Sequence, residues 1–258
     1  MEEARGLVIH WFMTSAVQRL LAVESATAQA EVAVLDAQGH VLAARSGQSG
    51  QHHSETLLPL IDAVMSESQT DWDRLTAVAV SVGPGAFTSL RIGVATVKGL
   101  CFGDERPVLA VPTLEALAWS ARELGGGGSV YPTLIPVLDA RRGEVYAAAY
   151  RNPQPAESGW GTILAPSVFR ADELKQALPE GGCLIGDGSL VVAGELEALC
   201  PGRFDGQAGS ALRPEAKAVG QLGLRAWASG QQIEASRLVP HYVRRAEAEV
   251  KRTQQRFE

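Results

Sequence analysis

The sequence predicts a duplicated α/β protein made of two related lobes, each with a mixed sheet flanked by helices. Two stretches carry this prediction, Leu20–Leu35 and Ile135–Tyr150, because each reads as a short apolar strand, an acid, a small polar turn and a returning strand. The acids are Glu24 and Asp139, and their matching places favour a duplication over two unrelated turn caps. Strands that alternate with helices indicate a mixed sheet covered by helices.

The first half supplies its elements in a regular order. The residues Asp36-Ala-Gln-Gly39 form a turn signal, and a third strand is expected directly after them. Apolar periodicity then predicts the remaining elements of this half. They are a helix from Ser54 to Ser68, a strand at 77–82, a glycine loop, a helix from Thr88 to Phe102 and a strand at 108–111.

The second half is less regular, and the boundary before it rests on four consecutive glycines. Gly125–Gly128 follows a predicted helix at 113–124, and such a run disfavours regular structure, so it reads as a flexible joint. Further on, a short strand at 183–186 and a helix at 213–229 are expected. The predicted ranges are a poorly ordered leader at 1–17, an N-terminal lobe at 18–112 and a C-terminal lobe at 113–258; Met1 or Met13 could be the natural start.

Composition excludes several classes of protein. The 258 residues include 23 Lys+Arg and 29 Asp+Glu, which gives a formal net charge of −6. Binding to nucleic acid phosphates needs a basic surface, so this charge does not suggest a protein that binds nucleic acid by itself. Three widely spaced cysteines, Cys101, Cys183 and Cys200, fit a reducing compartment better than a disulfide framework. No apolar run approaches the ~20 residues of a membrane span, and the start lacks a signal-peptide pattern. We therefore expect a soluble cytoplasmic protein without a membrane partner.

A glycine loop is the strongest hint of ligand binding. A buried strand ends in Gly83-Pro-Gly85 and leads straight into a helix, whose free amides and dipole could hold an anion. The loop is not a Walker motif, however, and a tight strand-to-helix turn explains it equally well. Gly186 follows a later strand in the same manner. These glycines and the two strand-end acids form a predicted vestigial phosphate-binding set: Glu24, Gly83, Gly85, Asp139 and Gly186.

The two helices of the first half carry more apolar and small residues than one packing face needs. On the later helix, Ser89, Gly93 and Thr96 form a small stripe, which allows another backbone to approach closely. The earlier helix has a broad apolar arc. These residues either pack in an ordinary core or contact a partner. The predicted partner interface is Leu57, Leu58, Ile61, Met65, Ser89, Gly93, Thr96 and Val97.

Residues for catalysis are not evident in the sequence. It contains no H-E-x-x-H, no C-x-x-C and no G-x-S-x-G pattern, so no metalloprotease or serine-hydrolase site of those kinds is supported. The adjacent histidines His52 and His53 do not point the same way and make no metal pair. We therefore predict no catalytic residue, no metal and no cofactor.

The segment Ser81–Leu100 resembles the hallmark segment of the TsaB (YeaZ) family. Supporting matches in the same order run from about Leu20 to Arg245: Leu20-Leu-Ala-Val-Glu-Ser-Ala-Thr27, His53-Ser-Glu-Thr-Leu-Leu-Pro59, Val111-Pro-Thr-Leu-Glu-Ala-Leu117, Leu138-Asp-Ala-Arg-Arg-Gly-Glu-Val-Tyr146 and Pro240-His-Tyr-Val-Arg244. The resemblance implies an actin-like (ASKHA) fold. It also implies that the chain is no enzyme itself but a dimerisation partner of the related catalytic protein TsaD, paired through the two helices described above.

The same resemblance implies a role in tRNA modification. The TsaB-type subunit and TsaD, together with TsaC and the ATPase TsaE, make N6-threonylcarbamoyladenosine at position 37 of tRNAs reading ANN codons. The resemblance implies that the chain contacts tRNA only as part of this complex. The lone chain could be a homodimer. Family members usually have Asp where this chain has Glu24, which argues against nucleotide use. A small ASKHA kinase or ATPase, resting on Glu24, Asp139 and the two glycine loops, is the main alternative, and a peptidase is a weaker one.

Overall fold

The structure is a computed structural model that describes residues 17–48, 50–104, 106–124, 131–152, 161–205 and 212–243. Its contacts divide the chain into two compact units. The first lobe comprises Met1–Gly126 with Leu212–Pro240, and the second comprises Gly127–Ala211 with His241–Glu258. The expected leader, except Val17, and the expected joint at Gly125–Gly128 lie outside the described residues.

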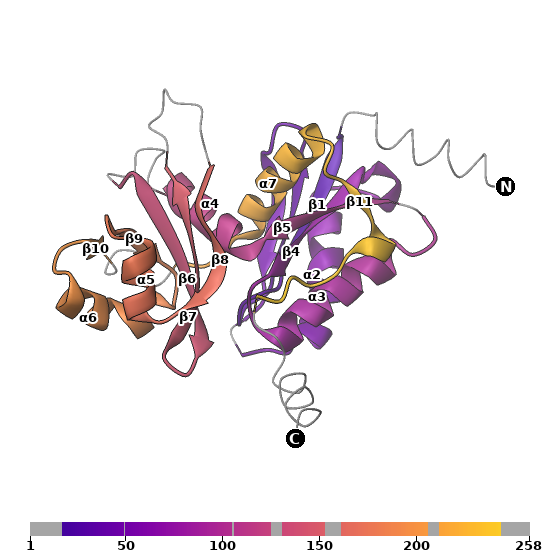
Figure 1. Cartoon of the computed structure of the whole chain (residues 1–258). Coiled ribbons are helices and arrows are strands. Elements are labelled where there is room, and N and C mark those ends of the chain that lie inside the picture. Colours follow the sequence, from indigo (N-terminus) through magenta and orange to yellow (C-terminus); the bar gives the residue numbers. More distant parts are fainter. Residues whose placement is uncertain are drawn as a thin grey trace, which may run out of the picture. The chain divides into compact units, whose positions relative to one another are not determined.

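The first lobe has a six-stranded mixed sheet, as predicted (Figure 1). Its order is β11-β5-β4-β1-β2-β3, with β1 antiparallel to β2, β2 antiparallel to β3, and β1, β4 and β5 parallel to one another. The strands are β1 (Arg19–Glu24), β2 (Glu31–Asp36), β3 (Val41–Ser46), β4 (Ala77–Gly83), β5 (Pro107–Pro112) and β11 (Ile233–Glu234).

Helices cover both faces of this sheet. Since side chains alternate between the two faces along each strand, neighbouring strand residues contact different helices. Leu21 and Val23 pack in one cluster with α2 (His53–Glu67) and α3 (Phe87–Leu100). The neighbouring residues Leu20 and Leu35 instead contact α7 (Ala216–Ala228), which lies on the other face with α4 (Thr113–Leu124) (Figure 1). The two helices of the predicted partner interface are therefore neighbours in one layer.

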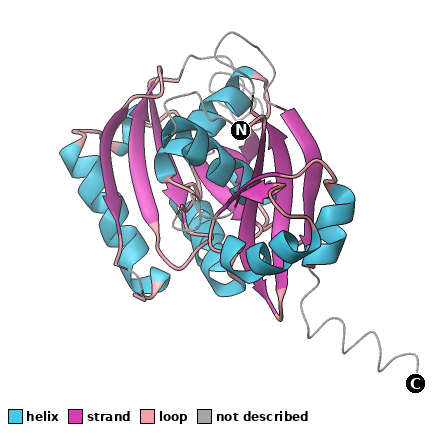
Figure 2. Cartoon of the chain, turned by 90° about the vertical axis from the view of Figure 1, so that its left-hand side faces the viewer, coloured by secondary structure: helices cyan, strands magenta, loops and turns pink. Residues whose placement is uncertain are grey.

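The second lobe repeats this connectivity. Its sheet has the order β10-β9-β6-β7-β8, in which β6, β7 and β8 are antiparallel and β6, β9 and β10 are parallel. Figure 2 distinguishes the strands from the flanking helices. The same order of antiparallel and parallel partners confirms the predicted duplication. The elements are β6 (Thr133–Arg141), β7 (Glu144–Arg151), β8 (Gly161–Phe169), α5 (Ala171–Ala177), β9 (Gly182–Ile185), α6 (Ser189–Leu199) and β10 (Phe204–Asp205).

The compact units do not coincide with the expected ranges 18–112 and 113–258. Helix α4 and residues 212–240 belong to the first lobe, because α7 packs directly on β1, β2, β4 and β5. Glu31 on β2 anchors the start of this segment: one carboxylate oxygen accepts the backbone N–H of Ala216 at 3.2 Å, and the other lies 3.6 Å from the Arg213 guanidinium. A carboxylate at a helix N-terminus is stabilising.

Replacing Glu31 by Ala is therefore expected to lower the free energy of unfolding by about 1–2 kcal/mol, through the loss of a cap and an ion pair. Chemical denaturation measures this change. Glu67→Ala, which removes a more exposed ion pair with Arg45, is the control and should cost less than about 1 kcal/mol. Equal losses in the two variants would contradict the anchoring role of Glu31.

Candidate functional site

The acid at the end of β1 is sealed inside the first lobe. Glu24 has no exposed surface, and its Oε1 accepts the backbone N–H of Ala26 at 2.6 Å. Among the described residues, its Oε2 has no hydrogen-bond partner. Burial raises the pKa of Glu24 to about 7, against the opposing effect of a hydrogen bond from Ser81. A carboxyl group so enclosed is not placed to contact a phosphate or a metal ion in solvent.

The glycine loop packs against the turn that follows Glu24. A Cβ at Gly85 would overlap the carbonyl oxygen of Ala26, which also accepts the backbone N–H of Ala86 at 2.8 Å. The N–H of Gly83 donates to the Thr113 hydroxyl at 3.0 Å. The structure thus places Gly85 beside the turn after Glu24, and it bonds Gly83 to Thr113. Two of the loop amides that could hold an anion are nevertheless already bonded within the lobe.

The matching acid of the second lobe is more exposed and differently paired. Asp139 accepts the backbone N–H of Arg141 at 2.7 Å, and its second carboxylate oxygen lies 3.3 Å from the Arg141 guanidinium. The backbone N–H of Asp139 donates to Asp187, the residue after Gly186, at 3.1 Å. Asp139 and Gly186 are therefore close in space. The ion-pair partner of the carboxylate is thus the hairpin's own Arg141, whose side chain is largely exposed.

Metal binding and thiol chemistry find no support in the described parts of the chain. They hold no group of three or more His, Cys, Asp or Glu residues arranged to bind a metal ion. All three cysteines are free and buried. Burial raises the pKa of Cys101 to about 12 and that of Cys183 to about 11, so both stay as unreactive thiols.

Half of the predicted interface residues lie in the interior of the first lobe. Leu57, Ile61 and Val97 are at most 3% exposed and pack on the sheet. A Cβ at Gly93 would overlap Oγ of the buried Ser25 and lie 2.9 Å from its Cβ. Gly93 therefore packs against the chain's own turn after β1. This finding corrects the prediction for these four residues, because no partner can reach them without opening the lobe.

The outward face of the same two helices has a different composition. Leu58 is 50% exposed, and Met65, Ser89 and Thr96 are partly exposed. The sequence interpretation missed Arg91, Ala95 and Gly99, which are exposed at i, i+4 and i+8 along α3. Within the described part of the chain, a Cβ at Gly99 would meet no atom within 4 Å. The helical period opposite the buried Leu90, Val94 and Val97 could have identified this stripe.

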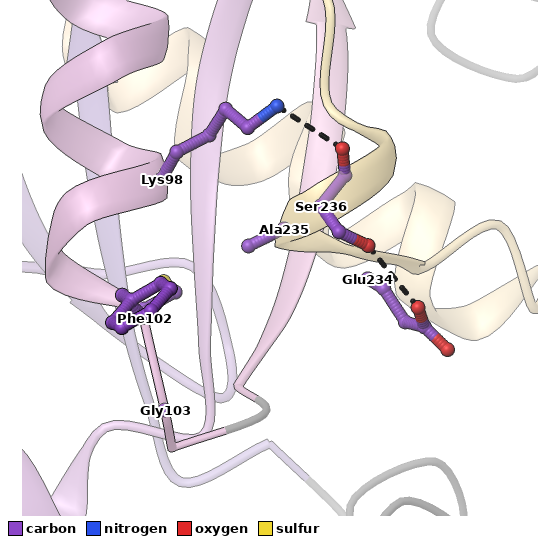
Figure 3. Close-up of a pocket in the computed structure, with 7 residues that line it drawn as sticks. Lys98, Phe102, Gly103, Glu234, Ala235 and Ser236 are labelled. Carbon is purple, nitrogen blue, oxygen red and sulfur yellow. Dashed lines mark hydrogen bonds between the residues drawn. The ribbon is translucent and has the colours of Figure 1, made fainter.

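A hollow of about 490 Å³ lies where α3 ends (Figure 3). Lys98 bridges it, because its ammonium group donates to the carbonyl oxygens of Ser236 at 3.0 Å and Leu238 at 3.2 Å. Leu238 is 1% exposed and completes the core beneath α2 and α3. The segment after β11 thus fastens onto α3. Phe102, 90% exposed, stands beside it; the lining residues are Lys98, Cys101, Phe102, Gly103, Glu234, Ala235 and Ser236.

Comparisons with known proteins agree with this geometry. The sequence model described as "TsaD: tRNA N6-adenosine threonylcarbamoyltransferase" matches residues 40–157. TsaB from Escherichia coli K12 is 28% identical over 230 residues, which are 88% of this chain and 94% of that protein. The structure of YeaZ from Pseudomonas aeruginosa matches with 30% identity and a TM-score of 0.71, covering 87% of this chain and 99% of that one. The chain belongs to the TsaB (YeaZ) family.

Membership in the TsaB family confirms the resemblance and the duplicated actin-like fold inferred from it. A catalytic relative is also similar: the tRNA N6-adenosine threonylcarbamoyltransferase of Novosphingobium aromaticivorans is 29% identical over 150 residues, which are 50% of this chain and 43% of that enzyme. The match spans less than half of the enzyme's own length. As for membranes, each helix in the described ranges is too short or too polar to cross a bilayer.

Proposed function

We propose that this TsaB-family chain takes part in the biosynthesis of N6-threonylcarbamoyladenosine in tRNA, as a non-catalytic subunit that binds a TsaD-type catalytic subunit. One combined observation carries the proposal: in a chain similar to proteins named for this pathway, the strand-end acid Glu24 is sealed, while the outer face of α2 and α3 is open. Other proteins of the ASKHA fold bind nucleotides, whereas in this chain we propose that the outer face of α2 and α3 binds a protein.

In this proposal the chemistry belongs to the partners. A TsaC-type protein makes threonylcarbamoyl-adenylate, and the TsaD-type subunit transfers the threonylcarbamoyl group to adenosine 37 of tRNAs reading ANN codons. A TsaE-type ATPase joins the complex, which acts in the cytoplasm. The chain meets tRNA only through this assembly, since its formal charge of −6 offers no strong attraction for phosphates.

The contact surface that we propose is the outer face of α2 and α3. It includes Leu58 and the stripe Arg91, Ala95 and Gly99. Small side chains on a helix leave a groove into which the side-chain ridge of a partner helix can pack. Exposed apolar groups beside the groove add apolar surface that the contact can bury. The surface therefore fits a helical partner layer.

Ala95→Arg is expected to weaken binding of the TsaD-type subunit from the same organism by at least about tenfold, because a long charged side chain would project into the proposed contact. Size-exclusion chromatography and calorimetry measure the effect. Ala228→Arg, the same change at an exposed position of α7 on the opposite side of the sheet, is the matched control and should bind normally. Equal binding by both variants would place the interface elsewhere.

The subunit role itself is tested by reconstitution. Threonylcarbamoylation of tRNA by the purified partner proteins should depend on adding this chain, and the wild-type chain should co-purify with the TsaD-type subunit. Calorimetry of the lone chain with Mg-ATP tests the alternative function. Tight binding and turnover by the lone chain would contradict the proposal and favour an ASKHA kinase or ATPase.

A further inference from the structure

The outer side of helix α6 in the second lobe is apolar and largely uncovered. Val192 and Leu196 lie in the core of this lobe, where α6 packs against α5 and the sheet (Figure 1). On the opposite side of the helix, Leu190 is 77% exposed and Val191 is also exposed. A Cβ at Gly194 would meet no atom within 4 Å among the described residues. The side of α6 that faces away from the sheet is therefore open to a partner.

The exposed residues of α6 form a stripe with an acid on each flank. At 3.6 residues per turn, Leu190, Gly194 and Ala198 fall within about 80° of one another around the helix axis. We call these three residues the α6 stripe, and all three are exposed. By the same helical geometry, Glu195 lies on one side of the stripe and Glu197 on the other, and both are exposed. This pattern resembles the apolar seam of a helix pair, which charged residues border on both sides.

The surroundings of the stripe are acidic. Helix α6 contains no lysine or arginine, and the first turn of the neighbouring α5 adds the exposed Asp172. Lys175 on α5 donates from its ammonium group to the carbonyl oxygen of Leu199 at 3.1 Å. Glu197 accepts the backbone N–H of Gly202 at 3.1 Å, and its side chain stays exposed beside the stripe. A partner of this face therefore meets apolar surface bordered by carboxylates.

This composition discriminates between possible occupants. A nucleic acid or an anionic membrane would bring negative charge to the carboxylates, and proteins bind both through lysine and arginine. A second copy that placed α6 on α6 would set acids against acids, which is unfavourable. A small molecule prefers a concave pocket, whereas the outer side of a helix is convex. A protein helix that is apolar on one side and basic on its flanks matches both the stripe and the acids.

We infer that the outer side of α6 binds a helix of a partner protein, with apolar side chains on the α6 stripe and lysine or arginine opposite Glu195 and Glu197. Gly194 and Ala198 leave a groove for the side-chain ridge of that helix. The 11 residues of α6 span about 16 Å, so the partner contributes roughly three turns and the contact is small and transient. This surface shares no residue with the outer face of α2 and α3, so the inference does not depend on the proposed function.

A synthetic peptide tests the chemistry of the surface. The probe is a fluorescent helix about as long as α6, with leucine and alanine on one side and lysine on both flanks. Fluorescence anisotropy should show saturable binding to the full chain. Leu190→Asp and Glu195→Arg should each weaken this binding at least about tenfold, through lost apolar contact and through repulsion. Added salt should also weaken it.

Controls separate this surface from general adhesion of the peptide. Leu58→Asp makes the same change at an exposed leucine of α2 and should leave peptide binding unchanged. A peptide with glutamate in place of lysine should not bind, and circular dichroism verifies that the variants fold. Absence of saturable binding, equal losses in Leu58→Asp and Leu190→Asp, or binding insensitive to Glu195→Arg would overturn the inference.

The partner itself is tested in the source cells. A photo-reactive phenylalanine analogue at position 194 should form a cross-link to a protein segment, and mass spectrometry should identify that segment as an apolar helix flanked by lysine or arginine. A cross-link to RNA or to an acidic segment, or no cross-link, would overturn the inference. Leu190→Asp should leave binding of the TsaD-type subunit unchanged. Weaker binding of that subunit would place α6 in its interface and would overturn the inference of a separate partner, while the proposed function would stand.

Discussion

Gly93→Leu is expected to destabilise the first lobe by about 3 kcal/mol or more, enough to unfold a marginally stable protein. The added side chain would overlap Ser25, which is fully buried in the turn after β1. Overpacking of this kind forces either the helix or the strand end away from the sheet. Chemical denaturation and circular dichroism measure the loss.

Gly99→Leu is the matched control for this variant. Position 99 lies on the same helix but faces open space, and leucine is a better helix former than glycine by up to about 1 kcal/mol. The Gly99 variant should therefore be at least as stable as wild type, while its binding of a partner through α3 should fall. If Gly93→Leu were as stable as Gly99→Leu, the packing of α3 against the β1 turn would be wrong.

Glu24→Gln is expected to stabilise the protein at neutral and alkaline pH. The pKa of Glu24 rises from 4.5 to about 7 on folding, so the protonated acid is the form that the folded lobe favours. The favourable contribution is complete below pH 4.5, falls as pH rises toward 7 and is absent above it. The shift corresponds to at most about 3 kcal/mol. Glutamine keeps a neutral side chain of similar shape, so it avoids this loss.

The measurement is the free energy of unfolding of both proteins between pH 4 and pH 8.5. The difference in favour of Glu24→Gln should grow from pH 4.5 to about 7 and then level off. Ser81→Ala should extend the loss in the Glu24 protein to higher pH, because the Ser81 hydrogen bond lowers the pKa of Glu24. A difference independent of pH would mean that the carboxyl group is not enclosed.

Local pattern alone determined much of this protein. Short apolar runs that end in Glu24 and Asp139 predicted the paired strands of both lobes, and the order of connections showed the duplication. The segment Ser81–Leu100, with the shorter matches in the same order, carried the resemblance to the family. These features are readable because strand period, turn chemistry and a family's characteristic segment depend on residues close together in the chain.

Long-range packing decided the rest. Gly93 and Gly99 look alike in the sequence, yet one fits against Ser25 and the other faces open space, and only the placement of α3 on the sheet distinguishes them. The same is true of Glu24, sealed by the loop at Gly85, and of α7, which joins the first lobe through Glu31 despite its late position. Burial depends on what the rest of the chain brings into contact, and helical or strand periodicity does not contain that information.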